Sequence, residues 1–158
     1  MKKRGYFEEH WSTPDYVYES LNREFNFDFD PYPVLDEADI NDSNDGTVID
    51  WGKRNYVNPP YKKDAKKEFV IKGIVEMDRG NLSALMLPVS TSTELFHDFV
   101  YPNATEIRFV RRRIKFIGKN SKGEIVSSSC GMADSMIIIF DPKDRPEVPR
   151  MRAMEFVQ

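Results

Sequence analysis

Residues 54–61 read Arg54-Asn55-Tyr56-Val57-Asn58-Pro59-Pro60-Tyr61, a short run typical of a strand followed by a double proline. Two consecutive prolines fix φ twice and remove two backbone donors, so this turn cannot continue a regular helix or an interior strand. The Asn58 side-chain oxygen and the Pro59 carbonyl therefore offer two acceptors in a stiff loop, and Tyr61 adds a flat ring. These groups suit a planar ligand that carries an exocyclic amino group.

The motif Asn58-Pro59-Pro60-Tyr61 resembles the catalytic motif of amino-methylating methyltransferases that use S-adenosylmethionine. Over most of its length the chain resembles the small phage and prophage DNA N6-adenine methyltransferases. The other segments that carry this resemblance are Trp11-Ser12-Thr13-Pro14, Phe27-Asp28-Phe29-Asp30-Pro31, Asp45-Gly46 with Trp51, Leu85-Met86-Leu87-Pro88, Arg113-Ile114-Lys115-Phe116 and Ser135-Met136. The resemblance implies transfer of a methyl group to adenine N6 in double-stranded DNA, with the target base flipped out of the duplex.

The composition predicts one globular domain over residues 1–158. Of these residues 40% are hydrophobic and 31% charged, and a chain of this length buries roughly 70% of its unfolded surface. A separate target-recognition domain would not fit. No apolar run approaches the ~20 residues of a membrane helix and no signal peptide is recognisable, so we expect a cytoplasmic protein without membrane contact. The resemblance narrows this to a bacterial host cell and a phage or prophage gene.

The content of metal-binding and basic residues bounds the function further. A single cysteine, Cys130, excludes an internal disulfide, and with only two histidines besides it no metal site is expected. The net charge of -3 does not by itself indicate a nucleic-acid partner, because strongly basic domains are the ones that charge alone identifies. Basic residues nevertheless cluster after the proline motif and again near residue 112, where they form either solvated faces or phosphate contacts. The candidate DNA-binding residues are Lys62, Lys63, Arg111, Arg112, Arg113 and Lys115.

The sequence Ser12-Thr13-Pro14-Asp15 predicts the start of a helix through Phe25, with a hydroxyl N-cap and a proline in the first turn. The resemblance adds that Thr13 and Pro14 lie against the methionine portion of S-adenosylmethionine. Trp11 is either a wall of the same pocket or a core residue.

Two acidic residues are candidates for cofactor binding. Residues 25–30 alternate aromatic and polar side chains, which predicts a strand that ends at Asp30-Pro31. The resemblance assigns Asp30 and Pro31 to the first cofactor motif, although no glycine-rich turn follows them. Asp45 with the glycine after it is either a tight turn or, by resemblance, the acceptor for the cofactor's adenine amino group.

The remaining pattern predicts an α/β fold. A helix over residues 64–79, a buried strand over 82–89 and a helix from Thr91 or Ser92 to Val100 precede strands at 105–110, 114–117 and 135–140. We expect a three-layer, Rossmann-like and methyltransferase-like arrangement with a mostly parallel sheet and an antiparallel edge. Residues 118–131 are expected to form a loop that closes over DNA or a simple hairpin tip. Residues 141–158 show little periodicity and are left as an extended arm or a homodimer contact.

Adenine methylation requires no general base before attack. The amino nitrogen is a poor nucleophile until acceptors hold its hydrogens, and Asn58 and the Pro59 carbonyl would supply them while Tyr61 stacks on the base. Other planar substrates stay open: the N4 amino group of cytosine, an RNA base or a protein glutamine. A non-catalytic DNA-binding module with a degenerate cofactor pocket is the remaining alternative.

Overall fold

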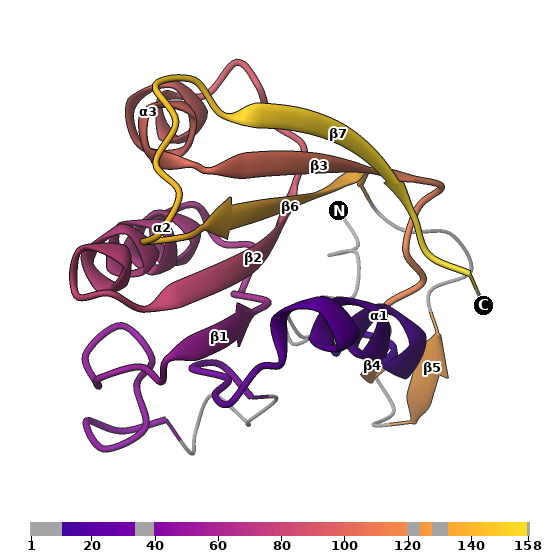
Figure 1. Ribbon diagram of the computed structural model, residues 1–158. Coiled ribbons are helices and arrows are strands. Elements are labelled where there is room, and N and C mark those ends of the chain that lie inside the picture. The colour runs from indigo at the N-terminus through magenta and orange to yellow at the C-terminus, as the bar shows by residue number, and fades with distance from the viewer. Residues whose placement is uncertain (1–10, 34–39, 120–123, 128–132, 158) are drawn as a thin grey trace, which may run out of the picture.

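The computed structural model describes residues 11–33, 40–119, 124–127 and 133–157. Its main sheet has five strands in the order β1-β2-β6-β3-β7 (Figure 1). β1 pairs with β2, and β3 pairs with β7, in parallel, whereas β6 is antiparallel to both β2 and β3. Four strands therefore share one direction, and their carboxyl ends lie along one edge. The strands are β1 Arg54–Val57, β2 Leu82–Pro88, β3 Glu106–Arg111, β6 Ser135–Phe140 and β7 Arg150–Glu155.

The antiparallel strand lies inside the sheet, so the predicted antiparallel edge is wrong. All six residues of β6 are buried, and this Ser-Met-Ile-Ile-Ile-Phe run suits a strand with neighbours on both sides. The two outermost strands are β1 and β7, and both pair in parallel with their neighbours. β7, next to β3, is mostly exposed. The tail after residue 141, expected to show little regular structure, thus supplies an edge strand.

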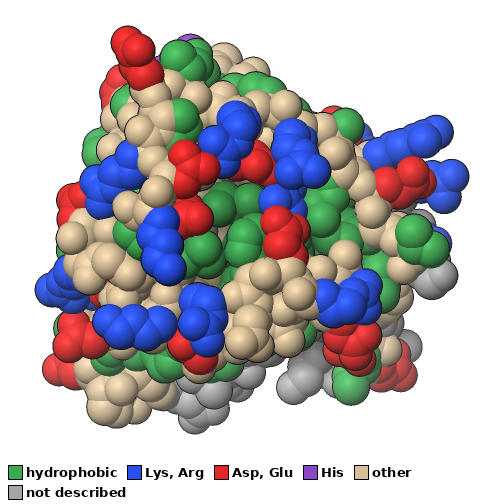
Figure 2. Space-filling view, in the orientation of Figure 1, with side chains coloured by type: hydrophobic (Ala, Val, Ile, Leu, Met, Phe, Trp, Pro, Cys, Tyr) green, Lys and Arg blue, Asp and Glu red, His purple; other side chains and the backbone are tan. Residues whose placement is uncertain are grey.

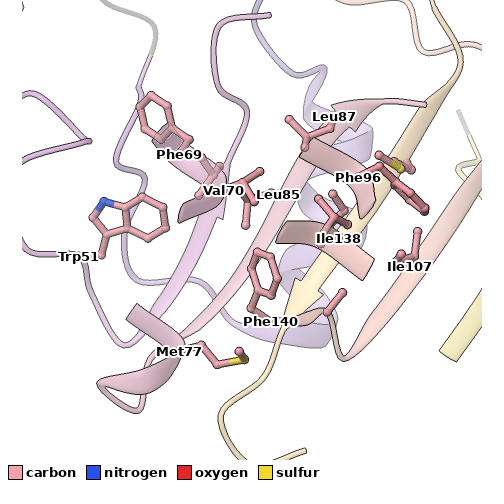
Figure 3. Packing of buried hydrophobic residues seen from close by; sticks show 14 residues of the cluster. Trp51, Phe69, Val70, Met77, Leu85, Leu87, Phe96, Ile107, Ile138 and Phe140 are labelled. Carbon is pink, nitrogen blue, oxygen red and sulfur yellow. The ribbon is translucent and has the colours of Figure 1, made fainter. Parts of the chain in front are cut away.

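Buried side chains fill both faces of the sheet. On one face, Leu85 and Leu87 of β2 share a cluster with Phe69 and Val70 of α2 Lys63–Asp78 (Figure 3). The π-helix η2 Leu95–Val100, which runs directly into α3 Tyr101–Asn103, also packs there. On the other face, alternate β2 residues pack with Val17 and Leu21 of α1 Asp15–Phe25. None of the helices in the described ranges is long and apolar enough to cross a membrane.

The segment after α1 differs from the predicted strand. Asn26 adopts the left-handed conformation with φ 51°, which ends the helix. Only Phe29 then forms a bridge, in parallel with Asn55 of β1. A single bridge is too short to count as a strand. The alternating aromatic residues therefore belong to a half-buried extended segment that lies beside β1.

Two other predicted boundaries move. The helix expected to start at Thr91 or Ser92 begins later, at η2, and the Thr93 hydroxyl before it accepts a hydrogen bond from the Phe96 amide. Pro102 lies within α3 rather than after the helix. Residues 114–116 are irregular, although Ile114 and Phe116 are buried. The expected loop over 118–131 contains part of an antiparallel hairpin, β4 Ile117–Lys119 and β5 Ile125–Ser127; residues 120–123 and 128–131 lie outside the described part.

Candidate active site

The loop that carries Asn58 leaves the carboxyl end of β1 and meets a short segment that precedes α1. In that segment Ser12 forms an antiparallel bridge with Ile117 of β4, with N–H···O distances of 2.7 and 3.0 Å. The indole of Trp11 lies against Gly118, where an added Cβ would fall 2.6 Å from two ring atoms. These contacts place residues 11–13 beside Asn58, although they are 45 or more positions away in the sequence.

The two segments and the residues after Phe29 enclose a pocket of about 170 Å³. Six of the predicted site residues line it together. Five lining residues are aromatic and two are carboxylates, and no Lys or Arg is among the described residues of its lining. The pocket therefore suits a ligand with positive charge and planar groups. Its lining is Trp11, Ser12, Thr13, Asp15, Tyr18, Asp30, Tyr32, Tyr56, Asn58, Pro59 and Tyr61.

The Asn58 side chain is held at one end. Its Nδ2 donates a hydrogen bond to the backbone carbonyl of Trp11 at 2.7 Å. Its side-chain oxygen accepts no hydrogen bond from any residue in the described ranges. The amide is thus oriented by the protein through its nitrogen, and the oxygen remains an acceptor in a pocket-lining residue.

Tyr61 is packed as well as pocket-lining. Its ring meets Phe116 edge to face, with centroids 6.2 Å apart. Its hydroxyl is buried and has no hydrogen-bond partner in the described part of the chain. Burial raises the pKa of this phenol well above its usual value. A buried hydroxyl without a partner is costly, and such groups often face a bound ligand or water.

Asp30 carries a perturbed carboxyl group. The backbone amide of Tyr32 donates to Asp30 Oδ1 at 2.9 Å. Burial raises the pKa of Asp30 from 3.8 to about 6, and the hydrogen bond from Tyr32 opposes this only in part. A desolvated carboxylate without a basic neighbour in the described pocket lining is suited to an ammonium or hydroxyl group of a ligand.

Thr13 does not cap α1, which corrects the predicted hydroxyl cap. The N-cap residue is Pro14, without a side-chain hydrogen bond, and Pro14 is buried and lines neither pocket described here. The Thr13 hydroxyl lies 2.5 Å from that of Tyr56 instead. Tyr56 is 2% exposed, and its ring packs edge to face on Tyr18 at 5.3 Å. The hydroxyl therefore links residues 11–13 to β1.

Asp45 belongs to a second pocket, of about 200 Å³, which also contains Pro31, Pro60 and Lys62. Asp45 Oδ1 accepts hydrogen bonds from the backbone amide and hydroxyl of Thr47, at 2.9 and 2.7 Å, so the expected tight turn is present. The buried Gly46 that follows is pressed against Pro31, because an added Cβ would lie 2.1 Å from the Pro31 oxygen. The two pockets share Tyr32, and consecutive prolines of the motif line one each.

Sequence reasoning missed Tyr18, Tyr32 and Tyr56 as pocket residues. A signal existed for Tyr56, because residues two apart in a strand face the same side and Tyr56 precedes Asn58 by two. Tyr32 follows Asp30 by two in an irregular segment, and Tyr18 comes from a helix face that pattern alone assigns to the core. The fold, rather than local sequence, brings these rings together.

The candidate DNA-binding arginines lie at the same sheet edge as Asn58 but outside both pockets. Arg111 ends β3, which is three strand spacings, or about 14 Å, across the sheet from β1. It also lies four residues, or about 13 Å along the strand, beyond Ile107, the β3 residue level with the end of β1. Arg111 and Arg112 are 71% and 80% exposed, with Glu155 at 3.4 and 3.7 Å. Arg113 pairs with Asp134 at 2.9 Å.

The two other candidate lysines, Lys63 at the start of α2 and Lys115 after the arginines, are also exposed. No single basic patch covers the face seen in Figure 2, where Lys and Arg side chains are interspersed with Asp and Glu. Exposed ion pairs of this kind are weak. The arginines can therefore exchange their carboxylate partners for phosphate at little cost.

Comparison with known proteins gives one match. The model of the family described as DNA N-6-adenine-methyltransferase (Dam) matches residues 3–154. No curated protein and no solved structure matches the chain. The matched range contains both pockets, the proline motif and all of the five-stranded sheet except its last residue, Glu155.

Proposed function

The chain belongs to the DNA N-6-adenine-methyltransferase family, and on that premise we propose that it transfers the methyl group of S-adenosylmethionine to an adenine flipped out of DNA into the pocket beside Asn58. The observation that carries this proposal is the Asn58 amide. Its nitrogen is engaged by Trp11 at 2.7 Å, while its oxygen is left as an acceptor.

Asn58 and Pro59 would hold the amino group of the base. The lone pair of an adenine amino nitrogen is delocalised into the ring, so the nitrogen becomes nucleophilic only when acceptors hold its hydrogens in a geometry that localises the lone pair. The Asn58 oxygen and the Pro59 carbonyl supply two fixed acceptors for those hydrogens. The same acceptors stabilise the positive charge that develops on the nitrogen during attack, and they do so best where water is excluded. No residue has to remove a proton first, because the methyl–sulfur bond breaks as the methyl–nitrogen bond forms, the neutral thioether leaves, and the methylated nitrogen loses its extra proton to solvent afterwards.

Tyr61 would provide the stacking surface for the base. Its ring is already held by Phe116, so little side-chain entropy is lost when a base stacks on it. Stacking on an aromatic side chain contributes about 1–3 kcal/mol per base. That amount is comparable with the few kcal/mol needed to unstack and unpair a nucleotide.

The pocket composition fits S-adenosylmethionine, which supplies an electrophilic methyl group on a sulfonium centre. Aromatic rings attract such a cation, and two carboxylates without a basic residue in the described lining add to the attraction. Asp30 would hold an amino or hydroxyl group, with Trp11 and Thr13 beside it. Each pocket alone is smaller than the roughly 300–1,000 Å³ of typical ligand sites. We therefore assign Pro31 and Asp45 of the second pocket to the far end of the same ligand.

The basic residues at the sheet edge would bind the DNA backbone. Lys62 and Lys63 flank the start of α2, where backbone amides and the helix dipole also favour phosphate. Arg111 ends β3, three strand spacings across the sheet from β1, and Lys115 precedes Phe116, whose ring meets that of Tyr61. A duplex laid along this edge would contact both groups while one base enters the pocket. In this proposal the sheet is the three-layer, Rossmann-like frame of a methyltransferase.

The test is transfer of labelled methyl from S-adenosylmethionine to unmethylated double-stranded DNA, followed by digestion to nucleosides. We expect label on adenine N6 with the wild type and none with Asn58→Ala, while calorimetry shows cofactor binding by both proteins. Label on cytosine N4, on RNA or on a protein glutamine would replace the proposed substrate. If calorimetry shows no cofactor binding by the wild type, the alternative of a non-catalytic DNA-binding module is favoured.

A further inference from the structure

We infer that residues 11–13, here called the arm, position the catalytic acceptor: the arm fixes the Asn58 amide so that its oxygen, and not its nitrogen, is presented to the target amino group. This inference rests on the proposed function and assigns a role to residues that touch neither reacting atom. Trp11 acts through its backbone carbonyl, which accepts from Asn58 Nδ2 at 2.7 Å.

The need for such a device follows from amide chemistry. The oxygen and nitrogen ends of an asparagine side chain are nearly the same size, and rotation about the last bond exchanges them. With the nitrogen toward the base, Asn58 would present donors to an amino group that is itself a donor. A fixed acceptor on the opposite side removes that orientation, because a carbonyl accepts from nitrogen and repels oxygen.

The arm can serve this purpose because it is anchored at three points. Ser12 forms its two-bond bridge with Ile117, and the Thr13 hydroxyl lies 2.5 Å from that of Tyr56. The third anchor is the Trp11 indole, which occupies the space that a side chain at position 118 would fill. Gly118 does not have a positive φ. Its lack of a side chain therefore makes room for the indole and is not required by the backbone conformation.

The variant that tests this inference is Gly118→Ala, because the added Cβ would lie 2.6 Å from the Trp11 ring atoms Cε3 and Cζ3. The ring must move, and we expect the Trp11 carbonyl to shift with it. We expect the methyl-transfer rate at saturating cofactor and DNA to fall about 10- to 100-fold. The Michaelis constant for DNA should change much less, because phosphate contacts are untouched. Trp11→Phe in the same chain removes the clashing ring atoms and should restore most of the rate.

A readout independent of activity is the pair of side-chain amide protons of Asn58, identified in nitrogen-15 NMR spectra by their loss in Asn58→Ala. In the wild type we expect slow solvent exchange of the bonded proton, and in Gly118→Ala exchange as fast as in a free asparagine. Gly73→Ala is the matched control, since its Cβ crowds Phe140 and Leu85 in the core at 3.1 Å or more, away from the arm. It should change neither the signals nor the rate.

Two results would overturn the inference: altered Asn58 signals with an unchanged rate, or unchanged signals in Gly118→Ala. If Gly118→Ala does not fold, Trp11→Ala removes the same anchor without crowding and is judged by the same signals and rate. If the wild type transfers no methyl group, the proposed function has failed. The amide signals then still decide whether the arm holds Asn58.

Discussion

The hydroxyl oxygens of Thr13 and Tyr56 lie 2.5 Å apart, although 43 residues separate them in sequence. This contact joins the arm to the strand that leads into the proline motif. Removing one partner leaves the other polar group in a site that is buried or nearly so, at a cost of about 1–3 kcal/mol.

We therefore expect Tyr56→Phe and Thr13→Val each to lower the free energy of unfolding by about 1 kcal/mol, and the double variant to lose less than the two together. Urea denaturation measures all three. Tyr101→Phe is a suitable control, because Tyr101 is 40% exposed. Fully additive losses would mean that the two hydroxyls do not stabilise each other.

Asp30 should make stability depend on pH. Its folded-state pKa of about 6 exceeds the ordinary 3.8, so the protonated form is favoured by folding. Stability from this group is fully present below pH 4 and is lost as the pH rises through 6, a change of about 2–3 kcal/mol. We expect Asp30→Asn to unfold with a higher free energy than the wild type at pH 8 and with a similar one at pH 4.

The measurement is a series of denaturation curves between pH 4 and 8, and Asp42→Asn on an exposed turn is the control. A constant difference between the wild type and Asp30→Asn at every pH would contradict the shifted pKa. The same variant should bind S-adenosylmethionine more weakly at pH 8, because the proposed ionic contact is removed.

Tyr61→Phe separates the ring from its hydroxyl. The hydroxyl is buried and without a partner in the described residues, so its removal should raise the free energy of unfolding of the unliganded protein by up to about 1 kcal/mol. If only the ring serves the base, the transfer rate stays near that of the wild type, whereas Tyr61→Ala loses stacking and affinity for DNA. A large loss of rate in Tyr61→Phe would assign the hydroxyl to the substrate or cofactor.

The edge arginines are predicted to act through phosphate. Replacing Arg111 and Arg112 together by glutamine should leave unfolding within about 0.5 kcal/mol, because their pairs with Glu155 are exposed. The affinity for every DNA sequence should fall alike, and the slope of log K against log salt should decrease by about 2. Fluorescence anisotropy at several salt concentrations measures this.

Arg145→Gln is a control for loss of a positive charge elsewhere on the surface, because Arg145 pairs with Asp78 at the far end of α2, away from the carboxyl ends of the strands. It should not alter the salt slope. A loss confined to particular DNA sequences in the Arg111 and Arg112 variant would instead indicate contact with bases.

Elements with strong periodicity were predictable. The apolar run of β2 and the helical stripe of α2, with buried Val70 and Met77, lie within a residue or two of their expected bounds. β7 was not predictable, because its sequence Arg-Met-Arg-Ala-Met-Glu is mostly exposed and its position in the sheet depends on pairing with β3. A local sequence pattern predicts an element when the element's own apolar residues form its buried face. It does not predict an element whose formation depends on pairing with a strand distant in sequence.

Some features of the candidate site were likewise predictable from the sequence and others were not. Thr13 and Asp30 line one pocket with Asn58, and Trp11, predicted as either a pocket wall or a core residue, both lines that pocket and packs on the core. The other cofactor candidates, Pro14, Pro31 and Asp45, lie outside it. The use made of Thr13 was not foreseen, since a hydroxyl before a helix is ordinarily a cap, and the buried Tyr56 competes for it only in the folded chain. Pairing between segments far apart in sequence is the information that a local pattern lacks.

The position of β6 has a consequence for how the protein is made. β6 is the strand that hydrogen-bonds to both β2 and β3, and it is not synthesised until residue 140. A growing chain that ends before Ser135 holds the β1–β2 pair and β3 as separate pieces, with open edges that other chains can join. Assembly of the sheet, and with it the carboxyl-end edge that carries Asn58 and Arg111, must therefore wait until β6 has been synthesised.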